Sequence, residues 1–189
     1  MVEGEPLIDV QHFDHIAIAV RDLARAAELY GDALGGELVR GGDDIDLGIR
    51  TMQFKLPPGV KVELLTPIGQ SYLARYLDKH GEGFHHATIF VADLHAAVAE
   101  MEARGFQIVD FDPAMETWQE AFVRPSSGFG ALLQLATSVS DWSTTIEGLT
   151  REGILAGEWR WINNECVHSD DVARRQMASV RPPKNFTDR

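Results

Sequence analysis

One segment of the chain occurs twice: Phe13-Asp14-His15-Ile16-Ala17-Ile18-Ala19-Val20-Arg21-Asp22-Leu23 returns 71 residues later as Phe84-His85-His86-Ala87-Thr88-Ile89-Phe90-Val91-Ala92-Asp93-Leu94. The same offset relates Val62-Glu63-Leu64-Leu65-Thr66 to Leu133-Gln134-Leu135-Ala136-Thr137. His15 and His86 therefore occupy equivalent places, as do Glu63 and Gln134. Because an internal repeat constrains the whole architecture, two copies predict a paired module and not a longer solenoid.

Each copy predicts the element order βαβββ from its hydrophobic periodicity, its helix-starting aspartate and its turn residues. In the first copy we expect a helix at Leu23–Leu34 and strands at Gln11–Val20, Glu37–Arg40, Ile49–Leu56 and Val60–Thr66. In the second copy the corresponding elements are Phe84–Val91, Leu94–Arg104, Gln107–Phe111, Glu120–Arg124 and Ala131–Thr137. A helix over Gln70–His80 is expected between them.

These elements predict an α+β fold in which the two βαβββ modules form a curled mixed sheet around a central cleft. We divide the chain into a first module (11–67), a linker helix (68–82), a second module (83–137) and a partly irregular C-terminal extension (138–189). The extension matches neither copy. Its tryptophans Trp159 and Trp161 are expected to cover apolar surface, and a short helix is expected near Asp171–Ala178.

Composition narrows the classes of function. The net charge of −12 argues against a nucleic-acid partner, because phosphate binding requires a basic surface. The acidic beginning of the chain is unlike a signal peptide, and we find no apolar run long enough to span a membrane. Cys166 is the single cysteine, which is compatible with a reducing cytoplasm. We therefore predict a cytoplasmic protein with no membrane partner and a small-molecule substrate.

The repeated polar positions predict a metal site. His15 and Glu63 lie on strands between apolar neighbours, and an isolated buried carboxylate is costly unless it is paired or binds a metal. Imidazole and carboxylate groups bind Zn, Mn, Fe, Co or Ni, and an amide oxygen can complete such a site. If both modules point these residues inward, His15, Glu63, His86 and Gln134 hold one divalent metal ion.

The paired modules and this His/Glu/His/Gln set resemble the vicinal oxygen chelate superfamily, which includes glyoxalases, bleomycin resistance proteins and dioxygenases. The segments Phe13–Val20 and Ser71–His86 resemble methylmalonyl-CoA epimerases in particular. The resemblance covers about residues 11–137. It implies that His15, Glu63, His86 and Gln134 are the metal ligands, that the metal holds two adjacent substrate oxygens, and that the protein is a homodimer.

The chain departs from the epimerases at the two non-histidine positions. Those enzymes typically have glutamine where this chain has Glu63, and glutamate where it has Gln134. Because a twofold rotation maps one half of the site onto the other, the exchanged set is the same site with its carboxylate on the opposite side. We therefore expect the substrate to bind rotated by about half a turn relative to the epimerases.

The first hypothesis for function is a metal-dependent isomerase or lyase, epimerase-like or glyoxalase-like, that enolises a substrate with two adjacent oxygens. Glu63 is a metal ligand in this hypothesis and also the catalytic base. A second base would have to be Asp44, Asp46 or Glu116, among which the sequence does not choose. Trp118 is either a core or lid aromatic or a substrate-binding residue, and in the second role it favours a more apolar substrate than methylmalonyl-CoA.

Two other functions use the same fold. One is a non-catalytic small-molecule binding or resistance protein, against which the retained histidines argue. The other is an Fe(II) dioxygenase, whose ligand set of two histidines and one carboxylate is met by His15, His86 and Glu63. We rank the dioxygenase lowest because the chain lacks the additional modules of common extradiol enzymes.

Overall fold

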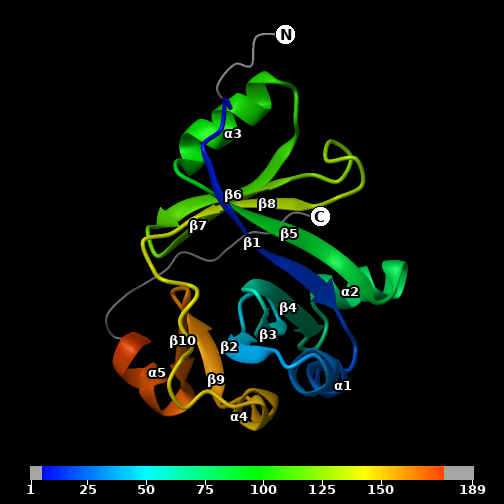
Figure 1. Cartoon of the computed structure of the whole chain (residues 1–189), viewed down its shortest axis with the longest axis vertical. Coiled ribbons are helices and arrows are strands. Elements are labelled where there is room, and N and C mark those ends of the chain that lie inside the picture. Colours follow the sequence, from blue (N-terminus) through cyan, green and yellow to red (C-terminus); the bar gives the residue numbers. More distant parts are fainter. Residues whose placement is uncertain (1–5, 177–189) are drawn as a thin grey trace. The chain divides into compact units, whose positions relative to one another are not determined.

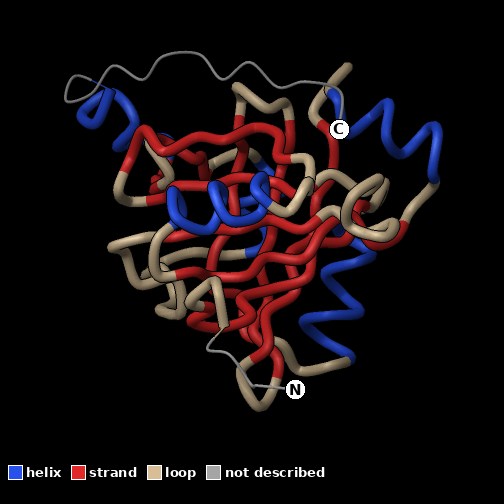
Figure 2. Tube along the Cα trace, turned by 90° about the horizontal axis from the view of Figure 1, so that it is seen from above, coloured by secondary structure: helices blue, strands red, loops and turns tan. Residues whose placement is uncertain are grey.

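The computed structural model describes residues 6–176 and confirms the α+β class. Ten strands form a mixed sheet with the order β10-β9-β2-β3-β4-β1-β5-β8-β7-β6, and the helices are few and short (Figure 2). The order βαβββ occurs twice. The first copy comprises β1 (Val10–Ala19), α1 (Leu23–Ala27), η1 (Glu28–Ala33), β2 (Glu37–Asp44), β3 (Ile49–Leu56) and β4 (Val60–Pro67). The second comprises β5 (Gly83–Val91), α3 (Leu94–Ala103), β6 (Ile108–Met115), β7 (Trp118–Val123) and β8 (Leu133–Thr137).

The remaining elements connect or follow the two copies. They are α2 (Tyr72–His80), α4 (Arg151–Ala156), β9 (Trp159–Ile162), β10 (Glu165–His168) and α5 (Ser169–Gln176). The chain divides into two compact units, and two of the boundaries between them fall within β1 and β5. Among the described residues, the first-repeat unit contains 15–85 and 141–176, and the second-repeat unit contains 6–14 and 86–140.

In the first-repeat unit, β4 is the strand that organises the site. It pairs in parallel with β1 and antiparallel with β3, which in turn pairs antiparallel with β2. Successive residues of a strand point to opposite faces. One face of these strands therefore packs into a core with α1 and α4, and its buried members include Met52, Phe54, Leu64 and Ile154. The other face is left for the polar residues.

The helix predicted over Leu23–Leu34 changes type part-way. Asp22 begins α1 by accepting a hydrogen bond from the backbone of Arg25, as expected for an N-cap. From Glu28 the chain continues as the π-helix η1, in which the amide of Leu34 donates to the carbonyl of Leu29. π-Helical segments are rare and carry no strong sequence signal, so the periodicity alone could not predict this change.

The C-terminal extension contains more regular structure than expected. Strands β9 and β10 form an antiparallel hairpin, and β9 joins the edge of β2 where Asp43 pairs with Arg160. Asn163 and Asn164 form the turn with φ of 51° and 64°, a left-handed pair that the two asparagines of the sequence could have predicted. Trp159 is buried in the core cluster that contains Ile154, as expected for a residue that covers apolar surface. Residues 177–189 of the extension lie outside the described part of the chain.

In the second-repeat unit, β8 pairs in parallel with β5 and antiparallel with β7, which pairs with β6. Helix α3 packs against β6, β7 and β8 (Figure 1). Asp93 caps the helix by accepting from the backbone of Ala96. The core between the helix and the strands consists of Val91, Leu94, Ala97, Val98, Ala121, Val123 and Leu135.

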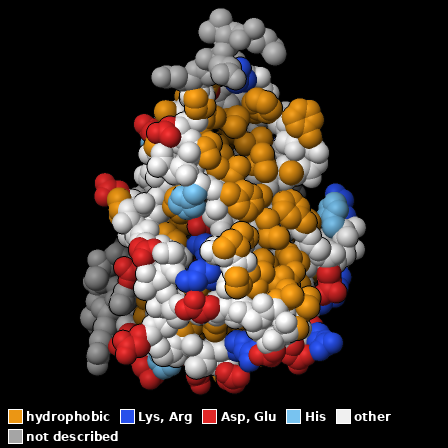
Figure 3. All heavy atoms as spheres, viewed as in Figure 1, with side chains coloured by type: hydrophobic (Ala, Val, Ile, Leu, Met, Phe, Trp, Pro, Cys, Tyr) orange, Lys and Arg blue, Asp and Glu red, His pale blue; other side chains and the backbone are white. Residues whose placement is uncertain are grey.

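Within residues 6–176, no helix is long and apolar enough to cross a membrane. On the face drawn in Figure 3, basic side chains occur in scattered groups beside acidic ones.

Candidate metal and active site

His15 and Glu63 form a buried pair in the first-repeat unit. The Nε2 atom of His15 lies 3.5 Å from Oε2 of Glu63, and the two residues are 2% and 9% exposed. Their strands, β1 and β4, are neighbours in which Ala17 pairs with Glu63. Residues at alternate positions share a face, so His15 and Glu63 point to the same side.

A glutamine orients the carboxylate of this pair. Gln53 is directly opposite Glu63 in the antiparallel β3–β4 ladder. Its Nε2 donates to Oε1 of Glu63 at 3.0 Å, which leaves Oε2 directed to His15. Partners of this kind fix the orientation of metal ligands and raise their affinity for the metal. Gln53 was not among the residues expected from the sequence, because only the register of the β3–β4 ladder places it opposite Glu63 and on the same face.

Two buried cations share this face. Lys61 is paired with His15 in the β1–β4 register and is 5% exposed. Arg40 is paired with Gln53 in the β2–β3 register and is 8% exposed. Both contact the C-terminal extension: Lys61 Nζ donates to the carbonyl of Trp142 at 3.1 Å, and the guanidinium of Arg40 lies 4.8 Å from the centre of the Trp142 ring. Local positive charge thus offsets the acidic character of the chain at this place.

The second-repeat unit has an equivalent polar face. His86 on β5 is 6% exposed, and its ring makes an edge contact with Phe122, with 6.1 Å between centroids. Phe122 is opposite Gln134 in the β7–β8 ladder, and Thr88 is opposite Gln134 in the β5–β8 ladder. His86, Thr88, Phe122 and Gln134 therefore point to one side of these three strands.

Both ends of the Gln134 amide are hydrogen-bonded. Its oxygen accepts from the hydroxyl of Thr88 at 2.5 Å, and its nitrogen donates to Glu120 Oε2 at 2.7 Å. A carbonyl oxygen has two lone pairs, so the bond from Thr88 leaves capacity for a second interaction. The bond to Glu120 fixes which end of the amide is the oxygen, because a carboxylate accepts and does not donate.

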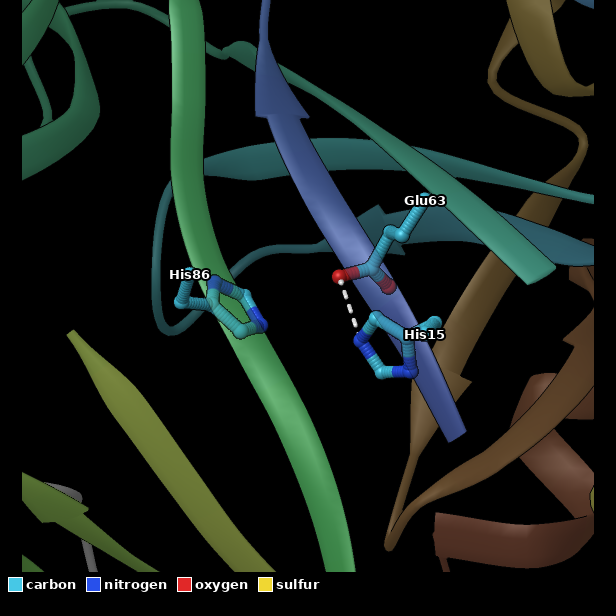
Figure 4. Close-up of side chains that lie close together, drawn as sticks. All are labelled: His15, Glu63 and His86. Carbon is cyan, nitrogen blue, oxygen red and sulfur yellow. Dashed lines mark ion pairs between the residues drawn. The ribbon is translucent and has the colours of Figure 1, made fainter. Parts of the chain in front are cut away.

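His15, Glu63 and His86 form a group with the composition of a metal site. One ligand atom from each residue can be chosen so that all lie within 4.8 Å of one another. Figure 4 shows the three side chains together, carried by β1, β4 and β5, with the ion pair between His15 and Glu63 drawn as a dashed line.

The residues fit a divalent transition metal. Zinc binds imidazole and carboxylate ligands at about 2.0–2.2 Å, so atoms on opposite sides of one ion lie about 4.2 Å apart. The His15–Glu63 distance of 3.5 Å is within that span. Two imidazoles and one carboxylate are also the donor types that Mn, Fe, Co and Ni accept.

The other candidate residues are Trp118 and the three acidic residues considered as a second base, and they do not share one environment. Trp118 lies on the site face of β7, where its ring makes an edge contact with Phe90 at 5.5 Å. Of the three carboxylates considered as a second base, Asp46 and Glu116 are exposed, and Asp44 accepts from the backbone amide of Leu47.

Comparison with known proteins identifies the family. The sequence model of the glyoxalase/bleomycin resistance protein/dioxygenase superfamily matches residues 14–122, which is more than half of the chain. The chain belongs to this superfamily. The resemblance inferred from the repeated motif is therefore confirmed.

Within the superfamily, the chain is similar to methylmalonyl-CoA epimerases. It is 30% identical over 132 residues to the mitochondrial methylmalonyl-CoA epimerase of Dictyostelium discoideum, an alignment that covers 68% of this chain and 79% of the relative. It is 36% identical over 102 residues to the ethylmalonyl-CoA/methylmalonyl-CoA epimerase of Cereibacter sphaeroides, covering 53% and 75%. The crystal structure of methylmalonyl-CoA epimerase from Mycobacterium tuberculosis has a TM-score of 0.64 and 29% identity, covering 72% and 93%.

Another similar solved structure contains a bound ligand. A methylmalonyl-CoA epimerase in complex with methylmalonyl-CoA and NH4+ matches with a TM-score of 0.62 and 25% identity, covering 73% of this chain and all of that one. The similarity to these epimerases supports an isomerase-like function for this chain. These alignments leave more than a quarter of the chain without a counterpart.

Proposed function

We propose that the protein is a divalent-metal-dependent isomerase that enolises an acyl-CoA thioester bearing a second carbonyl or carboxylate oxygen, as methylmalonyl-CoA does. The observation that carries this proposal is the His15–Glu63–His86 group in a chain whose relatives are epimerases. In the proposal these three residues and the amide oxygen of Gln134 hold the metal.

The metal, when bound, supplies Lewis acidity toward the two substrate oxygens. The protein residues would bind the substrate and transfer its proton. The hydrogen bond from Gln53 orients the carboxylate of Glu63, which is the proposed proton-transferring group on one side of the substrate. Enolisation requires a base within hydrogen-bond reach of the α-proton. Lys61 and Arg40 would attract an anionic acyl group to this face. Trp118 would pack against the apolar part of the acyl chain.

The first test is the metal content of the purified protein, measured by plasma mass spectrometry. We expect about one transition metal ion per chain, lost in His86→Ala. His95→Ala is the matched control, because His95 is an exposed histidine of the same unit. Absence of metal, together with no uptake of Co, Mn, Ni, Zn or Fe(II), would overturn the proposal and favour a binding protein.

The second test is catalysis itself. We expect the metal-loaded protein to exchange the α-proton of methylmalonyl-CoA with deuterium from D2O and to interconvert its two epimers. Metal binding without exchange on methylmalonyl-CoA or ethylmalonyl-CoA would remove the epimerase assignment. The lyase alternative, the homodimer and the cytoplasmic location remain predictions.

A further inference from the structure

The amide oxygen of Gln53 is a buried acceptor that the proposed function leaves unexplained. The Gln53 side chain is 3% exposed, and its Nε2 atom donates to Oε1 of Glu63 at 3.0 Å. A carboxylate accepts hydrogen bonds, so this contact identifies the nitrogen end of the amide and assigns Oε1 to the other end. Within residues 6–176, the buried Oε1 atom of Gln53 has no hydrogen-bond partner.

A buried acceptor without a donor is unfavourable, because its lost hydration is not replaced. Most buried polar atoms in folded proteins are therefore hydrogen-bonded. The donor for Gln53 is accordingly expected in a molecule that binds at this place. Since the other end of the amide is bonded to Glu63, a proposed metal ligand, that molecule would lie in the substrate site.

Thr51 presents a second polar group beside Gln53. The two residues are separated by one position on β3, so both side chains point to the site face from backbone positions about 7 Å apart. The Thr51 hydroxyl oxygen accepts from Nε1 of Trp161 at 2.9 Å, and a hydroxyl that accepts can still donate its proton. Two hydrogen bonds at a single oxygen atom join partners up to about 5.5 Å apart, and the longer glutamine side chain can cover the remaining distance.

The C-terminal extension places aromatic side chains next to this pair. The rings of Trp142 and Trp161 stack with 5.8 Å between centroids, and both residues are half-buried. Trp161 is bonded to Thr51, and the carbonyl of Trp142 accepts from Nζ of Lys61 at 3.1 Å. Both tryptophans are therefore attached to residues of the site face. Their rings offer contact to the alkyl part of a ligand, whereas Gln53 and Thr51 offer contact to a polar group.

We infer that Gln53 and Thr51 form a subsite for a hydroxyl group on the acyl chain of the substrate. This inference rests on the proposed function and names its substrate class, a hydroxyacyl-CoA thioester. The substrate hydroxyl donates to Oε1 of Gln53 and accepts from the hydroxyl of Thr51. A methyl group can make neither bond, a carboxylate cannot donate to Gln53, and an ammonium group cannot accept from Thr51.

The test compares two thioesters of nearly the same shape. 3-Hydroxypropanoyl-CoA carries the hydroxyl, and butanoyl-CoA has a methyl group in its place. Their dissociation constants are measured by calorimetry on the protein at saturating metal, because Gln53 also orients a proposed metal ligand. We expect the hydroxylated thioester to bind at least about tenfold more tightly, the factor that two neutral hydrogen bonds supply together. This measurement involves no catalytic step.

Four variants locate the preference. Thr51→Val and Gln53→Leu each remove one partner of the hydroxyl, so the preference should fall to about threefold or less. Thr51→Ser keeps a hydroxyl and should keep the preference, which shows whether an effect of Thr51→Val comes from the lost hydroxyl or from a misfolded protein. Thr66→Val is the matched control, because Thr66 lies on the opposite face of β4 from Glu63. This control should bind both thioesters as the unaltered protein does.

The outcomes separate this subsite from the proposed function. Equal affinities of the unaltered protein for the two thioesters would overturn the subsite and mean that Gln53 and Thr51 hold only water. A preference that persists in both Thr51→Val and Gln53→Leu would also overturn it and would assign the hydroxyl to the metal. If the metal-loaded protein prefers the hydroxylated thioester but does not exchange the α-proton of methylmalonyl-CoA, the isomerase proposal fails and the subsite stands. Binding of neither thioester would overturn both.

Discussion

Gln134 donates a hydrogen bond from Nε2 to Glu120 at 2.7 Å, and both residues are buried. In the first repeat Gln53 likewise donates a hydrogen bond to Glu63, at 3.0 Å. There the glutamine is on β3 and the glutamate on the next strand, β4, whereas Gln134 is on β8 and Glu120 on the preceding strand, β7. A buried carboxylate is stable only when charged or polar partners compensate for its lost hydration. Each repeat therefore uses an amide to hold one carboxylate in place on the site face.

The first prediction concerns Gln53→Leu. The leucine removes the donor to Glu63 Oε1 and frees the carboxylate to rotate away from His15. Since removal of such a second partner of a metal ligand typically costs about 10–100-fold in affinity, we expect the metal dissociation constant to rise by that factor. Competition with a fluorescent chelator measures it. Gln70→Leu, at an exposed position, is the control, and equal affinity in Gln53→Leu and the unaltered protein would contradict the prediction.

The second prediction concerns Thr88→Val, which removes the hydroxyl that donates to the Gln134 oxygen at 2.5 Å. The valine has nearly the same shape, so the main effect is loss of a donor to a buried acceptor. We expect the free energy of unfolding of the metal-free protein to fall by about 1–3 kcal/mol, as measured by urea unfolding. If Gln134 is a metal ligand, added metal should recover part of this loss. A metal-free stability equal to that of the unaltered protein would contradict the prediction.

Much of the fold follows from the repeat. The offset of 71 residues holds for β1 and β5 and for β4 and β8, so His15, Glu63, His86 and Gln134 could be aligned without a structure. Three of these four residues lie in the compact ligand group. The α+β class and the βαβββ order also follow, because the apolar alternation in strands and the capping aspartates are local signals.

Glu120 could not be found from the repeat for a physical reason. The connection from β7 to β8 is two residues longer than that from β3 to β4, when counted between the opposed residues Phe122–Gln134 and Gln53–Glu63. The constant offset therefore fails on β7, and only the strand register reveals that Glu120 is equivalent to Thr51. The hydrogen bonds across strands depend on that register and are not encoded in local periodicity.

The third prediction concerns Trp118→Phe. The phenylalanine keeps a ring beside Phe90 and loses the indole N–H that donates to Glu120 at 2.9 Å. If Trp118 contacts the acyl chain and holds Glu120, epimer interconversion should fall several-fold while metal content stays unchanged. Trp159→Phe, in the core of the other unit, should lower stability without this effect on the metal-loaded rate at saturating substrate. An unchanged rate in Trp118→Phe would contradict the prediction.

The fourth prediction concerns Cys166. Burial raises the pKa of the Cys166 thiol, although the positive charge of Arg40 opposes part of the shift. The folded protein therefore keeps the proton at pH values where the unfolded chain, with an ordinary thiol pKa of about 8.5, has begun to lose it. Stability should fall as the pH rises through that value. Labelling by iodoacetamide at pH 7.5 should be at least about ten times slower in buffer than in denaturant, and equal rates would contradict the prediction.

The fifth prediction concerns the attachment of the C-terminal extension to the site face. Nε1 of Trp161 donates to the hydroxyl of Thr51 at 2.9 Å, and the Trp161 ring stacks on Trp142 with 5.8 Å between centroids. Trp161→Phe keeps a ring in the stack and removes the donor, whereas Thr51→Val removes the acceptor. A hydrogen bond of this kind contributes about 0.5–1.5 kcal/mol.

A double-mutant cycle on urea unfolding measures this bond directly. We expect a coupling free energy of about 1 kcal/mol between Trp161→Phe and Thr51→Val, because the two changes remove one shared interaction. Thr51 occupies in the first repeat the position that Glu120 occupies in the second, and both accept from an indole N–H. Additive losses in the cycle would mean that the hydrogen bond between Trp161 and Thr51 does not hold the extension on the site face.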